Sequence, residues 1–123
     1  MTHSGGFKPA LVKPTVSRDA LAAIDIRLGT ILSVEDVPKS DRLVAVTVDF
    51  GDHRRRILAG LKQERANPQE IMGKQALFVV NLEPRKMMGQ VSEGMLFDIG
   101  YADGLKSVLA VPESPIPNGA QAG

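Results

Sequence analysis

The 123-residue sequence contains no cysteine and no tryptophan, and it has only two histidines. Without cysteine the chain can form neither a disulfide framework nor a thiolate metal site. No apolar run approaches the roughly 18 residues that a membrane-spanning helix needs, and the first residues lack the apolar segment of a signal peptide. These absences predict a cytoplasmic protein that does not insert into a membrane.

Net charge is also nearly absent, because fifteen basic side chains face fourteen acidic ones and leave a formal charge of +1. Such a balance does not by itself predict a polyanion as partner. Basic residues nevertheless cluster locally, at residues 54–56, at Lys62 with Arg65, and at residues 85–86. An RNA-binding surface would therefore be local, and the alternative for each cluster is a solvated charged face.

The sequence gives little support to an enzyme. His3 lies in an N-terminal stretch without periodicity, and His53 lies in a turn with Asp49 and Asp52. A metal site at that turn is a weak alternative, since acidic turns mostly serve the turn itself. No nucleophile with a paired base and no phosphate-cradling glycine spacing is visible. We therefore expect no catalytic residue, no metal and no cofactor.

The chain is expected to form one domain with a loose beginning. Residues 1–16 are rich in Gly, Pro and Lys, which predicts a flexible N-terminal arm. Residues 17–123 make up the domain, with a core over residues 24–100 and a C-terminal extension. Ser17 suits a helix N-cap, and a helix of about two turns is expected to follow, to Ala23.

Alternation of apolar and polar residues predicts a series of short strands. In the first strand Ile31 is the lone apolar exception to the alternation, and Gly29 marks the expected bulge or bend. Asn67 and Pro68 begin a short helix, which Gly73 ends. The expected strands cover residues 24–35, 44–50, 54–60, 76–80, 95–99 and 108–111, with a loop at residues 84–90.

Several short strands with one short helix between the third and the fourth predict a mainly β fold. The interpretation that fits best is a five-stranded OB-fold barrel with a short N-terminal helix and terminal extensions. An SH3-like barrel is the alternative, and the pattern alone does not separate the two.

Five pieces of sequence stand out along the chain, in this order: DIRLGTI at 25–31, PKSDRL at 38–43, VDFG at 48–51, AGL at 59–61, and NLEPRKMMG with SEGM within 81–95. Together they resemble the tRNA-binding domain family that is found fused to methionyl-tRNA synthetases. The resemblance implies an OB fold and tRNA as partner. Among the family the chain is most similar to free-standing bacterial homodimers named as chaperones for protein export, which implies, as an alternative, unfolded precursor proteins or peptides bound in a groove at the dimer interface.

The family motif makes residues 81–94 the first choice for RNA contact. Asn81 can both donate and accept toward a base edge or a 2′-hydroxyl, and Ser92 offers a hydroxyl. Arg85 and Lys86 can reach phosphates. The alternative is that Asn81 and Ser92 satisfy backbone groups within a rigid loop.

Further candidates lie around this segment. Lys39 and Arg42 in the first connecting loop are second candidates, because an OB-fold binds nucleic acid near such loops. Flexible methionines can contact bases or unfolded peptide, and their alternative role is to fill gaps in the core. The methionines concerned are Met87, Met88 and Met95. The basic side chains of residues 54–56 either form a phosphate rail, that is, a row of cations that contacts successive phosphates, or keep a strand edge soluble.

The aromatic residues argue against generic single-strand binding. Phe50, Phe78 and Phe97 fall at predicted core positions, so base stacking is not expected to be the main mechanism. Recognition of a folded RNA by shape and backbone, with steep salt dependence, is the expectation.

The resemblance implies a homodimer, and apolar residues outside the expected barrel support that expectation. They need burial against something, and a second copy related by a two-fold axis is the simplest partner. The expected interface residues are Leu21, Ala22, Val108, Leu109 and Val111.

Overall fold

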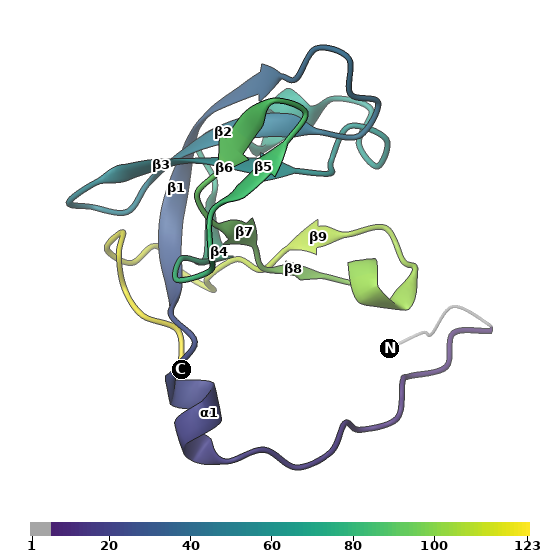
Figure 1. The fold of residues 1–123 in the computed structure, drawn as a ribbon, viewed down its shortest axis with the longest axis vertical. Coiled ribbons are helices and arrows are strands. Elements are labelled where there is room, and N and C mark those ends of the chain that lie inside the picture. The colour runs from purple at the N-terminus through teal and green to yellow at the C-terminus, as the bar shows by residue number, and fades with distance from the viewer. Residues whose placement is uncertain (1–5) are drawn as a thin grey trace.

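The computed structural model describes residues 6–123 of the chain (Figure 1). Residues 6–16 form neither helix nor strand and are exposed, while residues 1–5 of the expected arm, with His3, lie outside the described part. Helix α1 (Arg18–Ala22) follows Ser17, whose hydroxyl accepts a hydrogen bond from the Ala20 amide at 3.0 Å. The predicted N-cap is therefore confirmed, and it satisfies an amide that the first helical turn leaves free.

The described residues form strands that pair in antiparallel orientation. The main sheet has the order β3-β2-β1-β4-β7, β5 pairs with β6, and β8 pairs with β9. The predicted mainly β architecture is confirmed. The strands are β1 (Ile26–Asp36), β2 (Val44–Asp49), β3 (Arg54–Ala59), β4 (Gln75–Val79), β5 (Arg85–Met87), β6 (Gln90–Ser92), β7 (Met95–Leu96), β8 (Asp98–Ile99) and β9 (Val108–Leu109).

Strand β1 allows the sheet to curl into a barrel. Its first half pairs with β4 and its second half with β2, and the two partners meet at Thr30. The chain after β6 then returns to β3: the Glu93 amide donates to the Arg56 carbonyl at 2.9 Å, and the Arg56 amide donates to a Glu93 carboxylate oxygen at 3.0 Å. The five main strands thus form the OB-type barrel expected from the sequence.

The bend of β1 lies two residues later than the sequence indicated. The register against β2 shifts between Ile31 and Ser33, so Ile31 turns inward and is 1% exposed. The prediction of a bulge at Gly29 with Ile31 facing outward was wrong, since the register shift lies between Ile31 and Ser33 and Ile31 belongs to the buried core. Gly29 has a packing role instead, since a Cβ there would lie 2.4 Å from Val48 Cγ1.

The predicted helix between the third and fourth strands is present as a short 3-10 helix, η1 (Pro68–Ile71). The Asn67 side chain caps it by accepting from the Gln69 amide at 3.2 Å. Glu70 does not complete a capping box, because its carboxylate binds Arg65 at 2.8 Å. Ile71 is buried in the core.

The segment predicted as a loop at residues 84–90 is a β-hairpin. Strands β5 and β6 pair from Arg85 opposite Ser92 to Met87 opposite Gln90. The two connecting residues, Met88 and Gly89, have φ angles of 50° and 77°. Two consecutive positive φ angles are the geometry of a type I′ turn, which normally carries Asn-Gly. A methionine at the first position hid the hairpin from sequence analysis.

The C-terminal part of the chain wraps the barrel. The β8–β9 hairpin carries a second 3-10 turn, η2 (Tyr101–Asp103), and it projects from the sheet (Figure 1). The final residues lie beside β1, where the Leu28 amide donates to the Ala120 carbonyl at 2.9 Å. Phe97 is 42% exposed, which corrects its predicted core position. Among residues 6–123, no helix has the length and apolar character needed to cross a membrane.

Candidate nucleic-acid interface

A hollow of about 430 Å³ lies where the β1–β2 connection, the end of β3, the β5–β6 hairpin and the segment after β7 meet. Four side chains that sequence analysis picked out line it together, although they are far apart in the chain. They are Arg42, Arg85, Met87 and Met95. The barrel topology brings them together, because β3 contacts both β6 and β7 at this place.

The Arg42 guanidinium lies close to Gly60 at the wall of this hollow. A Cβ built on Gly60 would meet the Arg42 guanidinium at 3.2 Å from Nη2 and 3.6 Å from Nε. The Arg42 carbonyl also accepts from the Lys62 amide at 2.9 Å, which fixes the backbone below the side chain. A side chain at residue 60 would therefore displace the Arg42 guanidinium from its present position.

Strand alternation sorts the side chains of the hairpin. Arg85 and Met87 both line the hollow, and Lys86 between them lies on the opposite face of β5. Met87 packs against the small buried cluster that contains Leu43 and Leu58. Its packing fixes the hairpin, so Arg85 is presented from a strand and not from a mobile loop.

The basic side chains fall into two groups by their hydrogen bonds. Arg55 donates to the carbonyls of Val80 at 2.6 Å and Glu93 at 3.0 Å. Arg56 binds the Glu35 carboxylate at 2.9 Å and the Gln90 amide oxygen at 2.6 Å. These two arginines hold the barrel closed and are poorly placed to form a phosphate rail.

The second group of basic side chains is unpaired. Within residues 6–123 their charged groups make no ion pair and no hydrogen bond to protein. All are exposed, so their charges are free for an external anion. The group includes four of the candidates from the sequence, which are Lys39, Arg42, Arg85 and Lys86. The other members, none of which lines the first hollow, are Lys8, Lys13, Arg18, Arg54, Lys74 and Lys106.

Asn81 is engaged with the protein backbone. Its carbonyl oxygen accepts from the Asp25 amide at 2.8 Å, and its amide nitrogen donates to the Ala23 carbonyl at 2.7 Å. It therefore holds the end of α1 to the start of β1. The residue is exposed, and each end of its amide group keeps capacity for one more hydrogen bond.

Ser92 is 2% exposed, and its hydroxyl both accepts and donates a hydrogen bond inside the protein. It accepts from the Leu58 amide at 2.9 Å and donates to the Gly94 carbonyl at 2.9 Å. The hydroxyl thus ties the hairpin to β3, a role that sequence analysis gave as the alternative to RNA contact.

Two further candidates lie at turn tips outside the hollow. Lys39 in the β1–β2 connection has φ 71°, and Met88 at the hairpin tip is 53% exposed. Met95, 49% exposed, lies on the hollow itself. The structure therefore divides the predicted set between the hollow and its surroundings.

The acidic side chains of the turn with His53 bind groups within the turn itself. His53 Nδ1 lies 2.6 Å from an Asp52 carboxylate oxygen, and this hydrogen bond holds the pKa of the Asp52 carboxyl below its usual range. Asp49 accepts from the Gly51 amide at 2.8 Å. Nearby, the hydrogen bond to Asp25 raises the pKa of the Arg27 guanidinium. Over residues 6–123, no group of His, Cys, Asp and Glu side chains could hold a metal ion.

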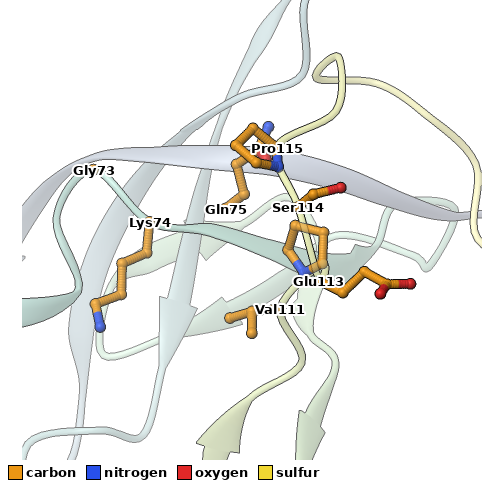
Figure 2. A pocket seen from close by; sticks show the side chains of 8 residues that line it. Gly73, Lys74, Gln75, Val111, Glu113, Ser114 and Pro115 are labelled. Carbon is orange, nitrogen blue, oxygen red and sulfur yellow. The ribbon is translucent and has the colours of Figure 1, made fainter.

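A second hollow, of about 480 Å³, lies between the start of β4 and residues 111–115 (Figure 2). In the close view Lys74 and Glu113 extend from its opposite sides, so its charges oppose each other. Gln75 is used to hold the C-terminal segment, donating to the Ile116 carbonyl at 2.6 Å. This hollow lacks paired cations and suits a polyanion less well.

Two lining residues of the first hollow escaped sequence analysis. Tyr101 is 59% exposed, and Asp98 accepts from the Tyr101 amide through Oδ2 at 3.1 Å. Both lie after the segments that carry the family motif. Tyr101 is the single tyrosine of the chain, and a lone aromatic beside Gly100 was the one available signal.

Comparison with known proteins agrees with this geometry. A family model described as "Putative tRNA binding domain" matches residues 26–121. The chain belongs to the tRNA-binding domain family. It is 42% identical over 119 residues to a methionine–tRNA ligase of Porphyromonas gingivalis, which covers 97% of this chain and 17% of the ligase. The chain thus spans only about a sixth of such relatives.

Solved structures carry the same fold as this tRNA-binding domain. A methionyl-tRNA synthetase-related protein from Pyrococcus horikoshii superposes with a TM-score of 0.82 at 31% identity, over 90% of this chain and 100% of that one. The chaperone CsaA from Bacillus anthracis gives a TM-score of 0.76 at 26% identity, over 89% and 100%. The predicted OB-type fold and the resemblance to the family are both confirmed.

Proposed function

We propose that this domain binds tRNA through the unpaired cations around the hollow and that it catalyses nothing itself. The observation that carries the proposal is the division of the basic side chains: Arg55 and Arg56 bind protein groups, whereas Arg42 and Arg85 are free. Free guanidinium groups form strong, often bidentate, hydrogen bonds to phosphate. A tRNA partner implies the cytoplasm as its location.

The charges support contact with phosphates at several points of a folded RNA. Arg42 and Arg85 lie on the hollow, and Lys39 and Lys86 add charge outside it. Phe50 and Phe78 are buried in the core, and no row of exposed aromatics covers the barrel within residues 6–123. Shape and backbone contacts, and not serial base stacking, therefore dominate recognition.

The proposal is tested by binding of labelled tRNA to the whole chain at low salt, with double-stranded DNA of equal charge as competitor. Micromolar or tighter binding that the DNA displaces poorly supports the function. Failure to bind tRNA at low salt would remove it.

We further propose that the domain acts as a homodimer. α1 buries none of its side chains, and Leu21 is 62% exposed. On the β8–β9 side, Val108 is 46% exposed and Val111 59% exposed. Both elements thus expose apolar side chains that a second copy of the chain could bury. Ala22 is exposed as well, whereas Leu109 packs partly against the core of its own chain and contributes less.

A dimer is tested by light scattering at micromolar concentration. Leu21→Glu and Val108→Glu place a charge on the proposed interface and should give a folded monomer. Val91→Glu is the matched control, because Val91 is 49% exposed on the β5–β6 hairpin and should leave the dimer intact. A wild-type monomer, or equal effects of all three variants, would contradict the dimer.

A second function, capture of unfolded precursor proteins, has one supporting observation. Met95 lines the hollow and is 49% exposed, and Met88 at the tip of the β5–β6 hairpin is 53% exposed. Flexible methionines can pack against varied apolar peptides. Salt separates the two functions, because tRNA binding weakens steeply as salt rises and apolar capture does not. Suppression of the aggregation of an unfolded protein at high salt would support the chaperone role.

A further inference from the structure

The hollow has a composition that phosphate binding alone does not require. Its apolar lining includes Leu43, Leu58 and Leu61, and Tyr101 stands at its edge, 59% exposed. The volume of about 430 Å³ lies within the range of about 300 to 1,000 Å³ that is common for sites of small ligands. A phosphate would gain nothing from leucine side chains, so this lining fits a flat, apolar ring.

A carboxylate completes the site. Asp98 lines the hollow, and its Oδ2 accepts from the Tyr101 amide at 3.1 Å. Within residues 6–123 no donor binds Oδ1, and a carboxylate can accept about four hydrogen bonds in all. A negative charge in the same hollow as Arg42 and Arg85 would weaken simple phosphate binding. It is useful where the ligand also brings N–H donors.

We infer that the hollow binds one unstacked guanine base of the RNA, an inference that rests on the proposed tRNA binding. Guanine carries two adjacent donors, N1–H and N2–H, on its Watson–Crick edge, and these match the two oxygens of Asp98. Uracil has one donor between two acceptors, while adenine and cytosine have an exocyclic amine beside an acceptor. Those acceptors would face the carboxylate and be repelled.

The neighbouring side chains fit the rest of the nucleotide. Tyr101 and Met95 are both exposed beside the lining and can contact the face of the base. Arg42 and Arg85 can reach the phosphates on either side of it. The site would therefore bind one base and its flanking phosphates together, as proteins do at unpaired positions of RNA.

The test uses the whole chain and four labelled RNA pentamers, UUGUU, UUAUU, UUCUU and UUUUU, followed by fluorescence anisotropy. The guanine pentamer should bind about fivefold more tightly than the other three, because a bidentate base contact discriminates by at least that factor. In Asp98→Asn the four should bind within about twofold of one another. Asparagine can still accept from the Tyr101 amide, so the turn is kept while a donor replaces one acceptor.

Two more variants separate the base from the phosphates. Tyr101→Leu should reduce the guanine preference, and Tyr101→Phe should retain it. Arg85→Ala should weaken all four pentamers by a similar factor, since a phosphate contact does not depend on the base. A preference for guanine that persists in Asp98→Asn would overturn the inference.

Binding of tRNA measured in parallel distinguishes the remaining outcomes. Salt-dependent tRNA binding without any guanine preference would overturn the base site and leave the proposed function in place. Absence of both would remove both. If the pentamers do not bind, and an unstructured peptide rich in leucine and lysine binds wild type but not Asp98→Asn, the hollow is a peptide site and the inference is wrong.

Discussion

The four unpaired cations of the proposed tRNA site predict how tRNA affinity depends on salt. The free charges are those of Arg42, Arg85, Lys39 and Lys86. Each phosphate contact makes the slope of log K against log salt more negative, by about 0.7 for single strands and about 0.9 for a duplex. Four contacts on one protomer give a slope of about −2.8 to −3.6. Replacing Arg85 and Lys86 by alanine should make the slope shallower, at about −1.4 to −1.8.

The ratio of the two slopes is the more robust quantity. Two of four contacts are removed on every protomer, so the slope halves whether one or two protomers bind the RNA. The assay is the fluorescence anisotropy of labelled tRNA between about 50 and 300 mM salt. In roughly this range, log K falls linearly with log salt. Both proteins need equal urea midpoints, because a partly unfolded variant would bind less at every salt concentration.

A matched control removes the same charge elsewhere. Lys13 and Lys74 are exposed and do not line the first hollow. Their double alanine variant loses two positive charges but should keep the wild-type slope within about 0.5 of a unit. Equal slopes for wild type and the Arg85, Lys86 variant would refute the reasoning, as would equal losses in the two double variants.

Three further substitutions test individual contacts. Gly60→Ala should displace the Arg42 guanidinium and weaken tRNA binding about two- to fivefold. The free energy of unfolding, measured with urea, should change by less than about 1 kcal/mol. Unchanged tRNA binding would contradict this prediction. Ser92→Ala should cost about 1 to 3 kcal/mol, because the Leu58 amide loses its buried acceptor; an unchanged urea midpoint would contradict it. Met88→Asn should raise the free energy of unfolding by about 0.5 to 1 kcal/mol, because asparagine tolerates a positive φ better. A lower urea midpoint than that of the wild type would argue against strain there.

Much of the fold could be predicted because its signals are local. The N-cap at Ser17 and the cap at Asn67 each depend on a side chain and an amide within three residues. Alternating apolar residues located the main strands. The bulge after Ile31 could not be placed, since it depends on pairing with β2 and not on a local pattern. The β5–β6 hairpin was missed because Met88 replaces the usual turn residue.

The candidate site could be predicted only in part. Arg42 and Arg85 follow from charge and resemblance, but their meeting at one hollow depends on barrel closure. Arg55 and Arg85 look alike in sequence, and only the hydrogen bonds of Arg55 to two carbonyls separate a structural arginine from a free one. For Ser92, a hydroxyl within a binding motif gave no indication of its burial.

The most direct measurement is the change of backbone amide chemical shifts when tRNA is added to the labelled protein. The account predicts that the largest changes fall on residues around the first hollow, at 42–43, 58–61, 85–87 and 98–101. Residues 111–115 at the second hollow should change little. Changes concentrated at residues 111–115, with none on the β5–β6 hairpin, would contradict the proposed interface.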